Sequence, residues 1–138
     1  MNVFADTSSL YAAIVRTEDR HRESLAILEG LLSGGRVIQT TNYVALETIS
    51  LLQHRIGLEP VRDFEERMLP LISVSWIDAE LHRRGMKRLL REGKRKLSLT
   101  DCISFEFMAA AGLRYAFSLD RHFVEAGFRL LEIGDEPR

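Results

Sequence analysis

The segment NVFADTSSLYA, residues 2–12, joins a β-type run to a helix through a single aspartate. The run NVFA predicts a strand, and the residues after it predict a helix over about 8–15. Asp6 lies at the junction, where an aspartate side chain can cap the helix by accepting hydrogen bonds from its first N–H groups. A strand that leads into a helix is the building unit of α/β proteins, and the rest of the chain repeats it.

Strand-like and helical segments alternate along the whole sequence. Further strands are expected at RVIQ (36–39), ISVSWI (72–77), YAFSL (115–119) and RLLEI (129–133). Further helices are expected over about 21–33, 43–56, 59–68, 79–92 and 99–111. This order predicts an α/β fold, with a mainly parallel sheet of about five strands, helices on both faces, and one domain over residues 1–138.

The composition is typical of a soluble globular domain. The chain has 138 residues, of which 46% are hydrophobic and 28% are charged, so it is large enough to bury a real core. Its one cysteine, Cys102, cannot form an internal disulfide, and no segment resembles an export signal or a membrane span. We therefore expect a cytoplasmic protein that does not enter a membrane.

Positive charge is concentrated in one segment, although the net charge is only -1. Between Arg83 and Lys96, eight positions are Lys or Arg and only Glu92 is acidic. One interpretation is a solvated helix whose last turn carries cations against the helix dipole. The other is a surface that contacts RNA phosphates, and its candidate residues are Arg84, Lys87 and Arg91.

Acidic residues recur where the predicted strands end. Asp6, Asp78 and Asp120 each follow a strand, and Glu47 lies about one turn into the helix after RVIQ. In an open parallel sheet, ligands bind beyond the carboxyl ends of the strands. Taken singly, Asp6 and Asp120 are explained by helix capping, and Glu47 by ordinary solvation.

Asp101 combines two patterns in the segment SLTDCISFEFMAAAG, residues 98–112. With Ser98 it forms the S-x-x-D pattern of a capping box. It also shares a helical face with Phe105 and Met108, which should face a core. Capping explains an acid in the first turn, but burying its charge costs several kcal/mol unless a cation compensates.

The acids Asp6, Glu47, Asp101 and Asp120 predict a cation site if folding brings them together. Two carboxylates about 4 Å apart repel each other by ~4 kcal/mol at an effective dielectric constant near 20. Oxygen donors without a cysteine or histidine at matching positions favour Mg²⁺ or Mn²⁺ over structural zinc. Such ions serve in-line displacement at phosphate.

Four segments resemble the signature segments of the PIN-domain ribonucleases, namely FADTSSLYA, TTNYVALETISLL, LSLTDCISFEFMAAAG and YAFSLDRHFVEAGF. The resemblance extends from Val3 to about Ile133, and the small single-domain form resembles the VapC-type toxins of toxin-antitoxin pairs. It implies a three-layer α/β/α sandwich, cleavage of RNA with Mg²⁺ or Mn²⁺, a homodimer, and a small antitoxin protein that blocks the site.

The same resemblance assigns roles to individual residues. Asp6, Glu47, Asp101 and Asp120 correspond to the catalytic and metal-binding acids of the family. Asp6 and Asp101 are expected to bind the ion directly, whereas Glu47 and Asp120 bind through water or orient the nucleophile. Thr7 or Ser8 is expected to help position the ion or the phosphate.

Other classes of α/β enzyme fit the sequence less well. A haloacid-dehalogenase-type phosphatase requires an aspartate where Ser8 stands, and a receiver domain requires an acid at Ala5 and a late lysine. No G-x-S-x-G segment is present, and His122 beside Asp120 implies no hydrolase triad. A non-catalytic module that binds RNA or protein, and a PIN nuclease of RNA processing, remain as alternatives.

The remaining aromatic and imidazole side chains are not expected to carry function. Trp76 and Tyr115 lie in strand-like runs and are expected in the core. His21, His54 and His82 are scattered along the chain and are expected on the surface.

Overall fold

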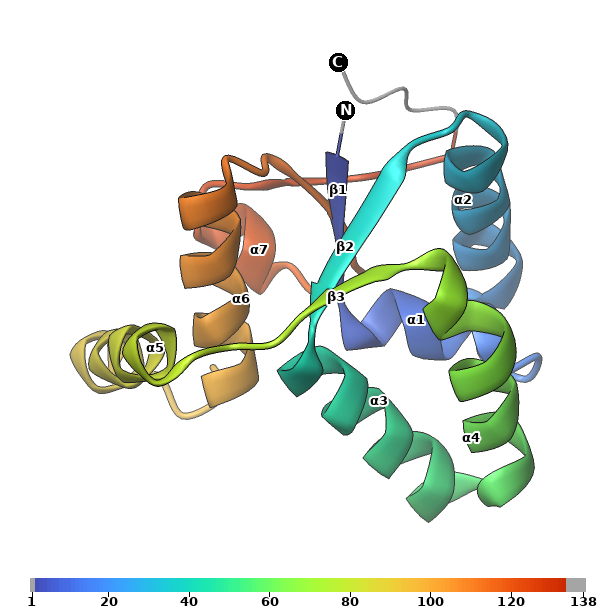
Figure 1. Cartoon of the computed structure of the whole chain (residues 1–138), viewed down its shortest axis with the longest axis horizontal. Helices are drawn as coiled ribbons and strands as arrows, with labels where there is room; N and C mark the ends of the chain where they lie inside the picture. The colour runs from blue at the N-terminus through green and yellow to red at the C-terminus, as the bar shows by residue number, and fades with distance from the viewer. Residues whose placement is uncertain (1, 134–138) are drawn as a thin grey trace.

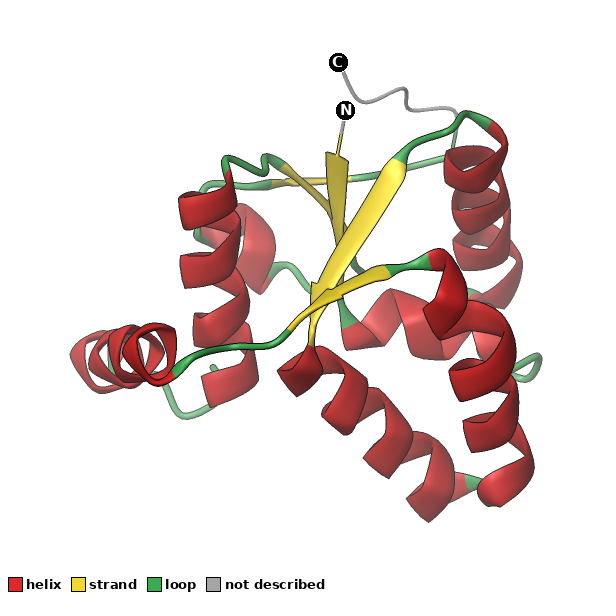
Figure 2. Ribbon diagram, viewed as in Figure 1, coloured by secondary structure: helices red, strands yellow, loops and turns green. Residues whose placement is uncertain are grey.

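Residues 2–133 are described by the computed structural model, and they form a parallel sheet between two layers of helices (Figure 2). The strands are β1 (Asn2–Ala5), β2 (Val37–Thr41), β3 (Ser73–Ser75), β4 (Tyr115–Phe117) and β5 (Arg129–Leu130). They form one 5-stranded sheet in the order β3-β2-β1-β4-β5, and every neighbouring pair is parallel. The predicted α/β/α sandwich is confirmed.

The helices cover both faces of this sheet. They are α1 (Thr7–Ile14), α2 (His21–Ser33), α3 (Asn42–Arg55), α4 (Leu58–Asp63), α5 (Ala79–Glu92), α6 (Leu99–Ala111) and α7 (His122–Glu125). In Figure 1, α5, α6 and α7 lie on one side of the strands, and α1, α2 and α4 lie on the other. Among residues 2–133, no helix has both the length and the apolar character that a membrane span requires.

The centre of the core is β1, which pairs with β2 on one side and β4 on the other. The side chains of Val3, Phe4 and Ala5 are all fully buried. On the α6 side, Phe105 meets Phe123 edge to face, with ring centroids 5.0 Å apart. Such an arrangement is favourable for aromatic quadrupoles, and it anchors α6 and α7 to each other.

The strand order reverses direction at β1. Chain segments α1 to α4 lead from β1 outward to β2 and β3, whereas α5 and α6 lead back across the sheet to β4. The carboxyl ends of β1 and β4 therefore lie at a topological switch point, where helices leave toward opposite faces and open a crevice. This position is where an open α/β sheet binds its ligands.

Several predicted elements are shorter or differently formed. The helix expected over 59–68 stops at Asp63 and continues as a π-type turn, Phe64–Met68, and a 3₁₀ turn, Leu69–Leu71. Pro70 has no N–H to donate and therefore does not favour a regular α-helix there. The edge strands β3 and β5 are also shorter than expected, since each pairs along one side only.

The expected burial of Trp76 is wrong. Its side chain is 81% exposed, because β3 ends at Ser75 and Trp76 follows it at the edge of the sheet. Tyr115, expected in the core, is half-buried, and the guanidinium of Arg129 covers its ring at 5.6 Å.

We predict that Gly85→Ala destabilises the packing of α5 on α6. A Cβ at this position would lie 2.4 Å from Cδ1 and 3.0 Å from Cγ1 of Ile103, which is fully buried. The overlap should lower the free energy of unfolding by about 1–3 kcal/mol, as measured by urea denaturation.

Gly30→Ala in α2 is the matched control, because nothing lies within 4 Å of a Cβ built there. This second change should raise the free energy of unfolding by roughly 0.5–1 kcal/mol, because alanine lowers the conformational entropy of the unfolded chain. Equal effects of the two substitutions would contradict the close contact at Gly85.

Candidate active site

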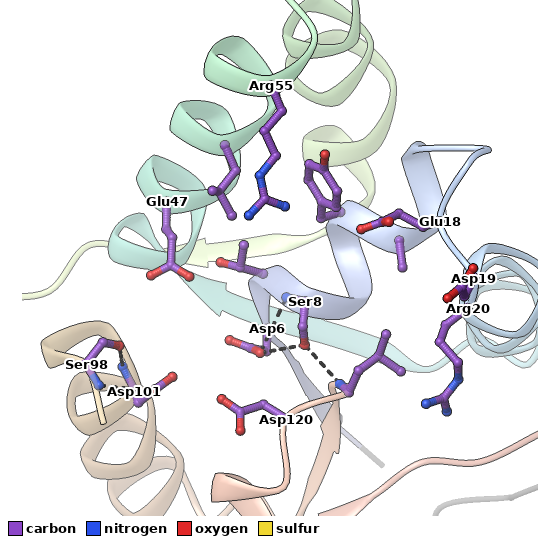
Figure 3. Close-up of a pocket in the computed structure, with 15 residues that line it drawn as sticks. Asp6, Ser8, Glu18, Asp19, Arg20, Glu47, Arg55, Ser98, Asp101 and Asp120 are labelled. Atoms are coloured by element: carbon purple, nitrogen blue, oxygen red, sulfur yellow. Dashed lines mark hydrogen bonds between the residues drawn. The ribbon is translucent and has the colours of Figure 1, made fainter. Parts of the chain in front are cut away.

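A cleft of roughly 450 Å³ opens at the carboxyl ends of β1 and β4 (Figure 3). The six residues expected at the site all line it, namely Asp6, Thr7, Ser8, Glu47, Asp101 and Asp120. Folding thus brings together the four acids that the sequence keeps far apart. Asp78, the other acid expected at a strand end, does not line this cleft. Its side chain caps α5 by accepting a hydrogen bond from Leu81 N at 2.8 Å.

Asp6 is buried at the junction of β1 and α1, with 4% of its surface exposed. Its backbone N–H donates to the carbonyl of Phe117 at 3.0 Å, which joins the ends of β1 and β4. Its Oδ2 atom accepts hydrogen bonds from the hydroxyls of Ser8 and Ser118, both at 2.9 Å. These bonds leave Oδ1 available for another ligand.

Ser118 fixes the loop that carries Asp120, and sequence reasoning did not identify it. Its hydroxyl accepts a hydrogen bond from Asp120 N at 3.0 Å, while it donates to Asp6. The neighbouring Leu119 N–H donates to the Ser8 hydroxyl at 2.9 Å. Two serines therefore hold the end of β4 against the start of α1, and this sets the position of Asp120 relative to Asp6.

Glu47 reaches the cleft because threonines fix α3 to α1. Thr41 caps α3 by accepting a hydrogen bond from Val44 N at 3.2 Å. The hydroxyl of Thr7 donates to the carbonyl of Val44 at 3.4 Å, and Thr48 lies 3.2 Å from the Thr7 hydroxyl. All three threonines are buried, so the start of α3 is held rigidly beside α1.

Asp101 both caps α6 and lies in the cleft with the other acids. The N–H of Ser98 donates to Asp101 Oδ2 at 3.1 Å, and the N–H of Asp101 donates to the Ser98 hydroxyl at 3.0 Å, which completes the capping box. Phe105 and Met108 are 2% and 0% exposed on the same face. The acid therefore caps α6 and also lines the cleft.

Burial raises the pKa of three carboxyl groups in the cleft, and the charges of neighbouring acids add to the increase. Burial raises the pKa of Asp6 to about 6, and the charges of Asp101 and Asp120 add to this, although the bonds from Ser118 and Ser8 oppose it. Burial also raises the pKa of Glu47, with a further contribution from the charge of Asp6. For Asp101, burial and then the charges of Asp120 and Glu47 act in the same direction. The cleft therefore favours a cation.

His122 joins this cluster, so the expectation that no histidine lies at a matching position is wrong. One donor atom each from Asp101, Asp120 and His122 lie within 4.8 Å of one another. Nδ1 of His122 lies 3.0 Å from Oδ1 of Asp120 without forming a hydrogen bond. The signal in the sequence is the spacing of two residues, because the turn into α7 brings the imidazole back beside the aspartate.

The donor set fits a hard divalent cation. Carboxylate oxygens predominate, they are partly or fully buried, and the described residues place no ammonium or guanidinium between them. Mg²⁺ accepts such oxygens, and Mn²⁺ accepts them together with an imidazole. A divalent ion would also remove the mutual repulsion that adds to burial in raising the pKa values of Asp6, Glu47 and Asp101.

Part of the basic segment, residues 83–96, has a structural role. Arg84 and Arg88 of α5 form ion pairs with Glu106 of α6 at 3.6 Å and 2.9 Å. Lys87 and Arg91 are exposed. None of the expected RNA-binding residues Arg84, Lys87 and Arg91 lines the cleft, and their contact with RNA stays a prediction.

The family model of the PIN domain matches residues 3–129, and the chain belongs to this family. A relative with a known activity is the 23S rRNA-specific endonuclease VapC20 of Mycobacterium tuberculosis. The two sequences are 31% identical over 127 residues, which cover 91% of this chain and 95% of VapC20.

Solved structures agree with this assignment. The crystal structure of Mycobacterium tuberculosis VapC20, described as a sarcin-ricin loop cleaving toxin, superposes with a TM-score of 0.81 at 29% identity and covers 94% of this chain and 98% of that one. FitAcB from Neisseria gonorrhoeae (TM-score 0.69, covering 96% and 97%) and VapBC2 from Rickettsia felis (0.70, covering 95% and 98%) are each 14% identical and show the shared fold.

We predict that Asp6 makes the metal-free protein less stable at neutral than at mildly acidic pH. Its pKa is 3.8 when exposed and about 6 when folded, so the folded state binds this proton more tightly. The stabilisation is complete below the unfolded pKa and is lost as the pH rises through the folded pKa, a change of at most about 3 kcal/mol.

Urea denaturation in the presence of a chelator, at pH values from about 4.5 to 7.5, measures this effect. Asp6→Asn cannot ionise, so its stability should fall less over the same pH range than that of the wild type. Parallel pH profiles of the two proteins would contradict the raised pKa.

We also predict that Asp101→Asn does not destabilise the metal-free protein. The asparagine carbonyl still accepts the hydrogen bond from Ser98 N–H, and the repulsion from Asp120 and Glu47 is gone. Ser98→Ala is the matched control, because it removes one arm of the capping box without changing the charge and should cost about 1 kcal/mol. A clear loss of stability in Asp101→Asn, measured in chelator by thermal denaturation, would show that capping alone explains this acid.

Proposed function

We propose that this protein is an endoribonuclease that hydrolyses RNA phosphodiester bonds with Mg²⁺ or Mn²⁺. The observation that carries the proposal is the convergence of Asp6, Glu47, Asp101 and Asp120 in one cleft at the switch point of the sheet. Membership of the PIN family and 31% identity to an enzyme named as an rRNA endonuclease support it.

The side chains divide the work according to their positions. Asp6 and Asp101 would hold the ion, because both are buried and each keeps an oxygen free of its capping hydrogen bonds. A bound divalent ion would activate water and stabilise the leaving oxygen of the phosphodiester. Glu47 and Asp120 orient the attacking water, and the raised pKa of Glu47 suits it to accept a proton from that water.

Ser8 and Thr7 act mainly through other residues. Ser8 donates to Asp6 and accepts from Leu119 N, so it fixes the direction in which the Asp6 carboxylate points. Thr7 donates to the carbonyl of Val44 and thereby sets the distance between α1 and Glu47. We propose that both residues keep the acids at the spacing that one ion requires.

We further propose that the protein is the toxin of a type II toxin-antitoxin pair, acts in the cytoplasm as a homodimer, and is inhibited by a small antitoxin protein. The likeness to VapC20, described as a toxin, supports this because it covers nearly all of both chains. A short reading frame beside the gene whose co-expressed product abolishes RNA cleavage would identify the antitoxin. Sedimentation analysis measures the oligomeric state.

We predict cleavage of RNA that depends on a divalent ion. The purified protein, incubated with total cellular RNA that includes 23S rRNA, should cleave with Mn²⁺ or Mg²⁺ and stop when a chelator is added. Asp6→Asn and Asp101→Asn should each slow cleavage by about a hundredfold or more, since each removes a ligand of the ion.

Asp63→Asn is the control for these variants. Asp63 is an exposed acid on α4 that pairs with Arg67 at the surface, at 3.9 Å, and it does not line the cleft, so its replacement should leave the rate unchanged. Cleavage by Asp101→Asn at the wild-type rate would show that the site is wrongly assigned. Tight binding of RNA by the wild type without cleavage would instead identify a non-catalytic binding module.

A further inference from the structure

One arginine of the cleft remains without a carboxylate partner. Of the two arginines that line the cleft, Arg20 bonds to Glu23, whereas Arg55 takes part in no ion pair within the described residues 2–133. The other charged residues of the lining are carboxylates, namely Asp6, Glu18, Asp19, Glu47, Asp101 and Asp120. Arg55 is thus the one cation of this cleft whose donors are not already bound to an acid.

Arg55 lies on the same face of α3 as a member of the acidic cluster. Glu47, Leu51 and Arg55 are spaced four residues apart, and all three line the cleft. Figure 3 shows the guanidinium of Arg55 pointing from α3 into the cleft, on the side where Glu47 and Ser8 lie. Eight residues of helix separate Arg55 from Glu47 by about 12 Å along α3, so it does not reach the ion site itself.

Tyr11 holds the guanidinium in place. The Cζ atom of Arg55 lies 5.3 Å from the centroid of the Tyr11 ring. Tyr11 is 7% exposed and belongs to α1, the helix that Asp6 caps. The stacking therefore fixes Arg55 relative to the same helix that positions Asp6 and Ser8, and less side-chain freedom is lost when a ligand binds.

We propose that Arg55 binds a phosphate of the RNA strand adjacent to the one that is cleaved. This inference depends on the proposed RNA hydrolysis. RNA is a polyanion, and a metal ion neutralises only the carboxylates near it, so the remaining acids of the cleft repel the flanking phosphates. A guanidinium offers two parallel N–H donors to a phosphate and is the only unpaired cation that lines the described cleft.

The test compares Arg55→Gln and Arg55→Lys with Arg62→Ala. Glutamine keeps much of the stem over Tyr11 but removes the charge, and lysine restores the charge without the planar pair of donors. Arg62 is an exposed arginine of α4 outside the cleft lining and serves as the control. All variants are made in wild-type and in Asp6→Asn protein, so that binding is measured without cleavage.

Binding of a short fluorescent single-stranded RNA is measured by anisotropy over a series of salt concentrations. Arg55→Gln should bind about tenfold more weakly, and the slope of log K against log salt should become shallower by about 0.7, the value for one lost phosphate contact. Arg55→Lys should recover the slope but only part of the affinity. Arg62→Ala should match its parent protein.

Kinetics and metal binding separate this role from a structural one. In active protein, Arg55→Gln should raise KM about tenfold and leave kcat within about twofold, and the increase in Tm caused by Mn²⁺ should be unchanged. If Arg55→Gln keeps the wild-type KM and salt slope while the wild type cleaves RNA, the inference about Arg55 fails and the proposed function stands. If the wild type neither binds nor cleaves RNA with Mn²⁺, both fail together.

Discussion

The structure depends on holding four carboxylates together against their own repulsion. Asp6, Asp101 and Asp120 accept hydrogen bonds from backbone N–H groups near helix starts, and Glu47 lies in the second turn of α3. The positive ends of α1, α3 and α6 therefore converge on the cleft and offset part of the negative charge. The serines and threonines around them supply the remaining compensation through hydrogen bonds. Because burial still raises three of the pKa values, this offset is incomplete, and a divalent cation would complete it.

Local signals in the sequence were sufficient to predict the order of helices and strands and to identify the four acids that line the cleft. The helices 21–33, 79–92 and 99–111 have the predicted bounds. A glycine follows each of them, and Asp78 and Ser98 cap the starts of the second and third. Ser118 was missed because its role depends on the pairing between β1 and β4, which no local pattern reveals. His122 stands two residues from Asp120 in the sequence, but its proximity to Asp101 of α6 depends on the tertiary fold. Trp76 was misplaced for a similar reason: the sequence shows a strand-like run but not that this strand lies at the edge of the sheet.

The segment with the most basic residues does not supply the arginines that line the cleft. The segment from Arg83 to Lys96 is conspicuous in the sequence, yet Arg84 and Arg88 are engaged with Glu106 of the neighbouring helix. Arg55 does not belong to this basic segment. It lines the cleft because it lies on the same face of α3 as Glu47, and its guanidinium lies over the ring of Tyr11 on α1. A surface that contacts a polyanion is therefore defined by faces of helices rather than by runs of residues.

The place of β4 in the sheet has a consequence for biosynthesis. This strand is inserted beside β1, the first strand of the described residues, and it brings Ser118 and Asp120 to a pocket whose other acids come from earlier in the chain. A nascent polypeptide that has not yet released β4 from the ribosomal exit tunnel lacks both groups. The acidic cleft is therefore incomplete until this late segment of the chain has joined the sheet, and any activity that depends on Asp120 arises only then.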